Sequence, residues 1–144
     1  MLHRMSEAPL DRAEFERWRV EADRALESAR RETAAGAHNW SCFLAEQSAQ
    51  FALKGLLHGI GVAPWGHDMV SLGGWVADAG IAVPNQIGDA VTRLGRHYIA
   101  TRYPDAHASG TASKHYSASD AEQAIADADA ILAFVDSSWR MLDG

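Results

Sequence analysis

Apolar side chains recur at three- and four-residue steps along most of the chain, the spacing of one face of an α-helix. The first such stretch runs from Asp11 to about Ala35. Asp11 followed by Glu14 resembles a capping box, and Gly36 is a natural stop. The pattern therefore predicts an amphipathic helix whose apolar face consists of Phe15, Trp18, Ala22, Ala25, Leu26 and Ala29.

The second stretch, from Asn39 to about Gly59, is apolar on two sides, which is typical of a central helix with neighbours on both flanks. Asn39 is the predicted cap. One side carries Trp40, Phe43, Leu44 and Phe51, and the other carries Ala45, Ala49, Ala52, Leu53, Leu56 and Ile60. We interpret the tryptophans at helical spacing as core residues. Gln47, Gln50 and Lys54 lie among apolar groups and need polar partners.

Three more helices follow. Asp68 is the predicted cap of a short helix that Gly80 ends. A fourth helix starts at Pro84 and ends near Thr101 or Arg102, because Pro104 disfavours helical backbone before it. Its buried stripe is Ile87, Val91, Leu94 and Tyr98. A final helix begins near Ser119, with Glu122 completing a capping box, and its stripe is Ala121, Ala124, Ile125, Ala128, Ile131, Leu132, Val135 and Trp139.

No strand-like alternation is present, so the predicted fold class is all-α, an up-and-down four-helix bundle with an additional short helix. We expect residues 1–144 to form one domain, with residues 1–10 and 142–144 as loose termini. A single cysteine, Cys42, excludes an intrachain disulfide and fits a reducing compartment. No apolar run is long enough to span a membrane, and the first residues lack a hydrophobic signal region. We therefore expect a cytoplasmic protein.

The net charge of −6 argues against a protein that coats nucleic acid indiscriminately. Residues 86–116 are nevertheless positive, with four basic side chains against two aspartates, a net +2. This segment contains Arg102 and, five positions later, His107. Arginine binds phosphate oxygens in a planar fork, and histidine transfers protons near neutral pH. We expect these two side chains to converge on one anionic pocket. The candidate substrate-binding residues around them are Tyr103, Asp105, Arg96, His97, Lys114 and Tyr116.

Structural roles are the alternative for several of these groups. Arg102 can pair with Asp105 or cap the last carbonyls of the fourth helix. Arg93 and Arg96 can form a solvated face. The sequence contains no glycine-rich phosphate loop ending in Gly-Lys-Ser/Thr, no His-Glu-x-x-His and no Gly-x-Ser-x-Gly motif. We expect neither a metal nor a cofactor.

Three sequence features together resemble the HEPN domain family. They are Gln47-x-Ala49-x-x-Ala52-Leu53-Lys54-x-Leu56, then His67-Asp68, then Tyr98-Ile99-Ala100-Thr101-Arg102-Tyr103-Pro104-Asp105. The resemblance implies a helical bundle that commonly dimerises. It also implies a metal-independent ribonuclease in which an arginine is followed four to six residues later by a histidine, a spacing that Arg102 and His107 match. Bacterial members of the family often act as toxins beside a small nucleotidyltransferase antitoxin.

The chain departs from the family pattern at two positions. In some members the partner adds AMP to a tyrosine two residues beyond the motif histidine, but here that position is Ser109. Gln50 stands where a glutamate is common. Two hypotheses follow from the resemblance. The first is an RNA-cleaving homodimer that is the toxin of a two-gene pair. The second is a non-catalytic module that binds a nucleotide or a nucleotidyltransferase partner.

Overall fold

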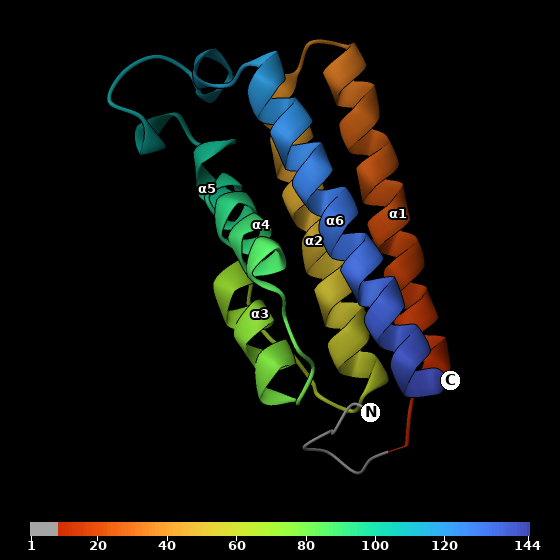
Figure 1. The fold of residues 1–144 in the computed structure, drawn as a ribbon. Coiled ribbons are helices and arrows are strands. Elements are labelled where there is room, and N and C mark those ends of the chain that lie inside the picture. Colours follow the sequence, from red (N-terminus) through yellow and green to blue (C-terminus); the bar gives the residue numbers. More distant parts are fainter. Residues whose placement is uncertain (1–8) are drawn as a thin grey trace.

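Helix α2 lies at the centre of the fold, as its two apolar sides predict. The computed structural model describes residues 9–144. Figure 1 shows α1, α2 and α6 as three long neighbouring helices, with α3 and α4 along the other flank of α2. α2 contacts α1, α6, α3, α4 and α5. The helices are α1 (Arg12–Ala34), α2 (His38–Gly59), α3 (Met69–Asp78), α4 (Asn85–Gly95), α5 (His97–Ala100) and α6 (Ala118–Asp143), with two 3-10 turns, η1 (Pro104–Ala106) and η2 (Ala112–His115).

The all-α fold class is confirmed, and within residues 9–144 no strand occurs. The predicted apolar faces of the helices meet in a single hydrophobic core. No helix in this part of the chain is both long and apolar enough to cross a membrane.

α1 and α2 pack closely because small residues line their contact. A Cβ added at Gly55 would lie 2.8 Å from the Cβ of Trp18 and 3.3 Å from the backbone oxygen of Phe15. Buried hydroxyls bridge the same two helices: Ser48 Oγ donates to the Ala22 carbonyl at 2.7 Å. The contact therefore requires glycine at position 55 and polar groups short enough to reach across.

Two of the predicted helix caps are confirmed and two are wrong. Asp11 and Asp68 accept hydrogen bonds from backbone N–H groups of α1 and α3, as predicted. Asn39 is not a cap, because α2 begins one residue earlier and Asn39 lies in its first turn. The last helix is capped by Ser117 and Asp120, which bond reciprocally, instead of by Ser119 and Glu122. Both errors shift the start of a helix by one or two residues.

The predicted fourth helix is interrupted. α4 ends at Gly95, and α5 starts at His97 after one residue in a turn. Ile87, Val91 and Leu94 are buried as predicted, but Tyr98 is only partly buried. The turn directs the Tyr98 ring toward Phe43 on α2 (centroid separation 6.3 Å) and away from the core stripe.

The chain ends and one tryptophan also differ from expectation. Of the predicted loose N-terminus, residues 1–8 lie outside the described part of the chain. At the C-terminus α6 continues to Asp143, which pairs with Arg12 at 2.9 Å, and Leu142 packs against the core. Trp40, predicted to be in the core, is 45% exposed.

Candidate functional site

The functional arginine predicted from the sequence lies where the end of α5 meets the start of α2. Thr101, which follows α5, is fully buried and donates through Oγ1 to the His97 carbonyl. The Thr101 carbonyl accepts from Asn39 Nδ2 at 3.0 Å. This bond connects two segments 62 positions apart in sequence and fixes the backbone directly before Arg102.

The Arg102 guanidinium is surrounded by aromatic rings. Its carbon lies 4.4, 4.8 and 5.1 Å from the ring centroids of Phe43, Tyr98 and Tyr103. Nε and Nη2 both donate to the Tyr98 carbonyl, so Arg102 caps the end of α5, which was one of the structural alternatives. No carboxylate in residues 9–144 lies within ion-pair distance of Arg102, Asp105 included. We call Asn39, Phe43, Tyr98, Arg102 and Tyr103 the Arg102 corner.

His107 faces a different set of partners. Its Nε2 lies 2.6 Å from the Ala100 carbonyl and must carry the proton, because a carbonyl only accepts. Its ring is stacked on His115 at 4.1 Å with an interplanar angle of 6°. Tyr116 approaches the same ring edge-on at 6.3 Å. The second ring nitrogen, Nδ1, makes no hydrogen bond within the described residues.

Within one chain, Arg102 and His107 make contacts with different partners. No hydrogen bond or ring contact in the described residues joins the two side chains. A pocket of about 480 Å³ includes Arg102 but not His107. We call it the Trp40 pocket; its lining residues are Gly36, Ala37, Asn39, Trp40, Arg102, Pro104, Thr111, Ala112 and Ser113.

The other candidate substrate-binding residues are placed as follows. Tyr103 is 46% exposed beside Arg102, and Asp105 is exposed on η1. His97 is partly buried, with its ring edge against Tyr116 at 5.6 Å.

Burial lowers the pKa of His97, and burial raises the pKa of Tyr116 to about 12, so His97 is neutral at pH 7 and Tyr116 keeps its proton. Arg96 and Lys114 are exposed. Neither belongs to an ion pair within residues 9–144.

A buried carboxyl on α2 was missed by the sequence analysis. Glu46 is fully buried, and it accepts hydrogen bonds from the side-chain amides of Gln50 and Gln47. Burial raises the pKa of Glu46 from 4.5 to about 7, while the nearby charges of Arg102 and Lys54 act in the opposite direction. The sequence signal that could have identified Glu46 was the presence of Gln47 and Gln50, two buried-face glutamines that needed polar partners. Their partner was hidden because Glu46 lies on a helix that is apolar on both sides.

Gln50 extends this polar cluster toward the Arg102 corner. Its Nε2 also donates to the His67 carbonyl at 3.0 Å. The His67 ring stacks on Tyr98 at 5.0 Å. The cluster around Glu46 therefore supports the ring that contacts the Arg102 guanidinium.

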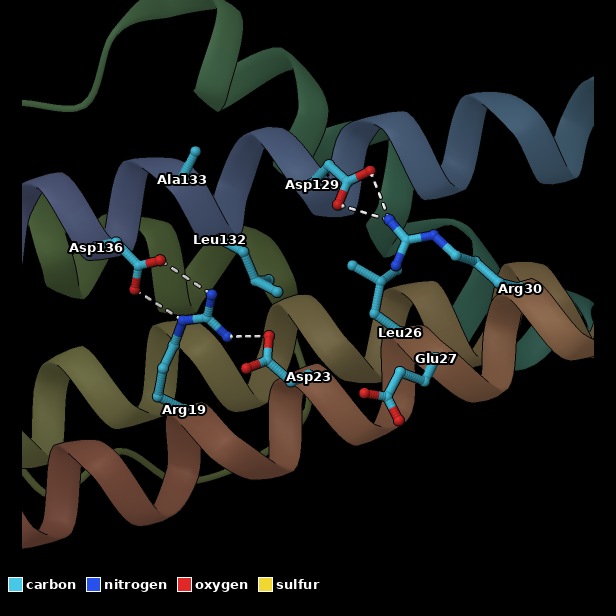
Figure 2. A pocket seen from close by; sticks show the side chains of 9 residues that line it. All are labelled: Arg19, Asp23, Leu26, Glu27, Arg30, Asp129, Leu132, Ala133 and Asp136. Atoms are coloured by element: carbon cyan, nitrogen blue, oxygen red, sulfur yellow. Dashed lines mark hydrogen bonds and ion pairs between the residues drawn. The ribbon is translucent and has the colours of Figure 1, made fainter.

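Several other arginines are paired with carboxylates. Arg93 forms two hydrogen bonds with Asp127 on α6, at 2.8 and 3.0 Å. Figure 2 shows a groove between α1 and α6 in which Arg19 pairs with Asp136 and Asp23, and Arg30 pairs with Asp129. We call it the α1–α6 groove; it is lined by Arg19, Asp23, Leu26, Glu27, Arg30, Asp129, Leu132, Ala133 and Asp136.

Comparison with known proteins places this helical bundle in a family. The model of the HEPN domain matches residues 15–138, and the chain belongs to that family. The crystal structure of TT1696 from Thermus thermophilus is similar over 86% of this chain and 97% of its own, with 39% identity and a TM-score of 0.82.

Two further solved structures agree with this assignment. An archaeal HEPN homologue shares 33% identity over 85% of this chain and 95% of its own, with a TM-score of 0.73. A HEPN domain protein from Thermotoga maritima shares 25% identity over 84% and 95%, with a TM-score of 0.69. No curated protein matches the chain.

Proposed function

We propose that this HEPN protein is a metal-independent endoribonuclease that binds an RNA phosphate at Arg102 and uses His107 as its general acid or base. The observation that carries the proposal is the guanidinium of Arg102. It lines an open pocket, and it has no carboxylate within ion-pair distance in the described residues. An arginine in that state attracts an anion, and three aromatic rings limit its rotamers before the anion binds.

The chemistry needs two proton transfers. A base removes the 2′-hydroxyl proton, the oxygen attacks phosphorus to give a 2′,3′-cyclic phosphate, and an acid protonates the departing 5′-oxygen. One histidine per chain supplies one of these groups. A two-fold homodimer would supply a second His107 and a second Arg102 to the same cleft. We therefore infer that activity depends on dimerisation.

A second candidate function is favoured by the different contacts that Arg102 and His107 make. Because the two side chains have different partners, and because His107 Nε2 is bonded to the Ala100 carbonyl, the corner can bind a nucleotide without any cleavage. In this view the protein is a non-catalytic HEPN module. It would bind a nucleotide or a nucleotidyltransferase partner.

We further propose a small nucleotidyltransferase as the antitoxin partner of this chain. Ser109 occupies the position where some family members carry the modified tyrosine. Two tyrosines elsewhere in this segment could take its place: Tyr103 is exposed and Tyr116 is partly buried. If the partner transfers AMP to this chain, Tyr103 is the accessible acceptor.

Replacement of His107 tests the nuclease proposal. The purified protein is incubated with single-stranded RNA in the presence of EDTA, beside His107→Ala and His107→Gln. Glutamine keeps a side-chain N–H for the Ala100 carbonyl but transfers no proton, so it separates structural from chemical loss. We expect cleavage by the wild type and none by either variant.

Cleavage that survives in both variants would rule out His107. The second function predicts no cleavage by any of the three proteins, together with a rise in melting temperature when a nucleotide is added.

A further inference from the structure

Trp40 stands out because it is half exposed in a helix whose other apolar residues are mostly buried. It lies in the first turn of α2, where Phe43 contacts its ring edge-to-face at a centroid separation of 6.1 Å. This contact orients the indole, while 45% of the residue stays open to solvent at the Trp40 pocket. An oriented, exposed aromatic face is the feature that proteins use to stack on an unpaired nucleobase.

Asn39 gives the same pocket a hydrogen-bond acceptor. The residue is only 7% exposed, and its Nδ2 donates to the Thr101 carbonyl. That bond fixes the amide orientation, because a carbonyl cannot accept from Oδ1. Oδ1 accepts no hydrogen bond from any group in residues 9–144, yet it is not sealed from solvent. An amide oxygen left open to the pocket in this way can accept a hydrogen bond from a ligand N–H group.

Arg102 lies on the same pocket as Trp40 and Asn39, and two of its five N–H groups are used on the Tyr98 carbonyl. The remaining N–H groups suit a phosphate oxygen. Thr111 and Ser113 add exposed hydroxyls that hydrogen-bond each other at 3.0 Å. The pocket volume of about 480 Å³ is within the range of small-ligand sites. An aromatic face, an amide acceptor and a cation thus share one opening.

We propose that the Trp40 pocket binds one unpaired amino-bearing nucleobase of the RNA, stacked on Trp40, with its exocyclic amine on Asn39 Oδ1 and its phosphate on Arg102. This inference rests on the proposed RNA substrate. It names the part of the RNA that the protein recognises, an unpaired base. Trp40 is then a binding residue for single-stranded RNA. A duplex is excluded because its bases are already stacked and paired.

Fluorescence anisotropy with two probes tests the proposal. One probe is a short, labelled 2′-O-methyl oligoadenylate, which lacks the attacking hydroxyl and survives cleavage. The other is the matched abasic oligomer. Trp40→Ala is expected to weaken binding of the oligoadenylate about tenfold and to leave binding of the abasic oligomer unchanged. Trp40→Phe retains a stacking face and should recover most of the affinity. Trp65→Ala removes an indole that is 78% exposed but lies outside the pocket, and it should change neither affinity.

A third probe tests Asn39 without altering the protein. Oligopurine riboside lacks the exocyclic amine of adenine, so it should bind several-fold more weakly than the oligoadenylate to the wild type. Equal affinities of wild type and Trp40→Ala for the oligoadenylate would overturn the inference while leaving the nuclease proposal in place. A Trp40→Ala protein that changes its oligomeric state at unchanged RNA affinity would also overturn it, and would assign the pocket to a second copy of the chain. Failure of the wild type to cleave RNA affects only the proposed function.

Discussion

The α1–α6 groove and the Arg102 corner both present arginines, but only the groove neutralises them. In the groove, Arg19 and Arg30 pair with aspartates at 2.6–3.0 Å. In the corner, Arg102 is bonded to a backbone carbonyl and surrounded by rings. A neutralised arginine has little affinity left for an anion, whereas a cation without a carboxylate partner retains it. Of these two clusters, the corner is therefore the better candidate for an anion-binding site.

The two regions also differ in where they place carboxyl groups. The aspartates that line the groove are solvent-accessible and paired with arginines. The carboxyl beneath the corner belongs to Glu46, which is fully buried and bonded to two amides. Stability in the groove should therefore respond to salt, and stability near the corner should respond to pH.

The largest expected effect concerns Glu46. Burial raises its pKa from 4.5 to about 7, so the folded protein binds this proton more tightly than the unfolded chain. The resulting stabilisation is complete below the unfolded pKa and is lost as pH rises through the folded pKa, a change of about 3 kcal/mol. Glu46→Gln should remove this part of the pH dependence and should be more stable than wild type at pH 8. Urea unfolding at several pH values measures it.

Glu27→Gln in the groove is the matched control for that experiment, since Glu27 is exposed. It should keep the wild-type pH profile. A Glu46→Gln profile that matches wild type would mean that the buried carboxyl does not distinguish the corner from the groove.

Arg19→Met is expected to have the next largest effect, on stability alone. Arg19 is mostly buried and bonds Asp136 twice and Asp23 once. Methionine keeps the apolar stem but loses these charge-assisted bonds, which should lower the free energy of unfolding by about 1–2 kcal/mol. Affinity for the oligoadenylate should not change. A loss of RNA binding in Arg19→Met would show that the groove, and not only the corner, contacts RNA.

Arg102→Met should give the opposite result. Oligoadenylate and abasic oligomer should both bind about tenfold more weakly, or ~1.4 kcal/mol, because a phosphate contact is independent of the base. The free energy of unfolding should fall by only about 0.5–1 kcal/mol, from the lost cap and ring contacts. Unchanged affinity for both probes would mean that Arg102 acts only as a helix cap.

The smallest expected effect is that of salt on the groove. Raising NaCl from about 0.1 M to about 1 M shortens the screening length to about 3 Å and should weaken the surface pair of Arg30 and Asp129 by less than about 0.5 kcal/mol. Arg30→Gln should show a smaller salt response than wild type in thermal unfolding. An equal response would place the salt sensitivity elsewhere in the molecule.

Most of the fold was predictable because helical periodicity is a local property. The stripes of α1 and α6 and the two-sided pattern of α2 each identified residues that are buried. The errors lie where tertiary contacts overrode local signals. Asn39 has the chemistry of a cap, but its amide bonds the Thr101 carbonyl, which is far away in sequence. The interruption between α4 and α5 follows the packing of Tyr98 against α2 and His67.

The candidate site was predictable in part. Arg102 was identifiable as a candidate from its sequence context, and capping the end of the predicted fourth helix, now α5, was among its predicted roles. Trp40 was not identifiable because its helical spacing predicted a core residue. Glu46 was not identifiable because it lies on a helix that is apolar on two sides. The partners that determine their properties are Phe43 beside Trp40 and the amides of Gln47 and Gln50 around Glu46.

The sequence by itself determined the order of the helices, the central place of α2 and the residues that could bind an anion, because helical periodicity and side-chain chemistry can be read from neighbouring positions. Only the tertiary structure decided that Arg102 lacks a carboxylate partner in the described residues, that Trp40 is exposed and that Glu46 is buried. Those properties depend on distances between helices, which local sequence patterns do not specify.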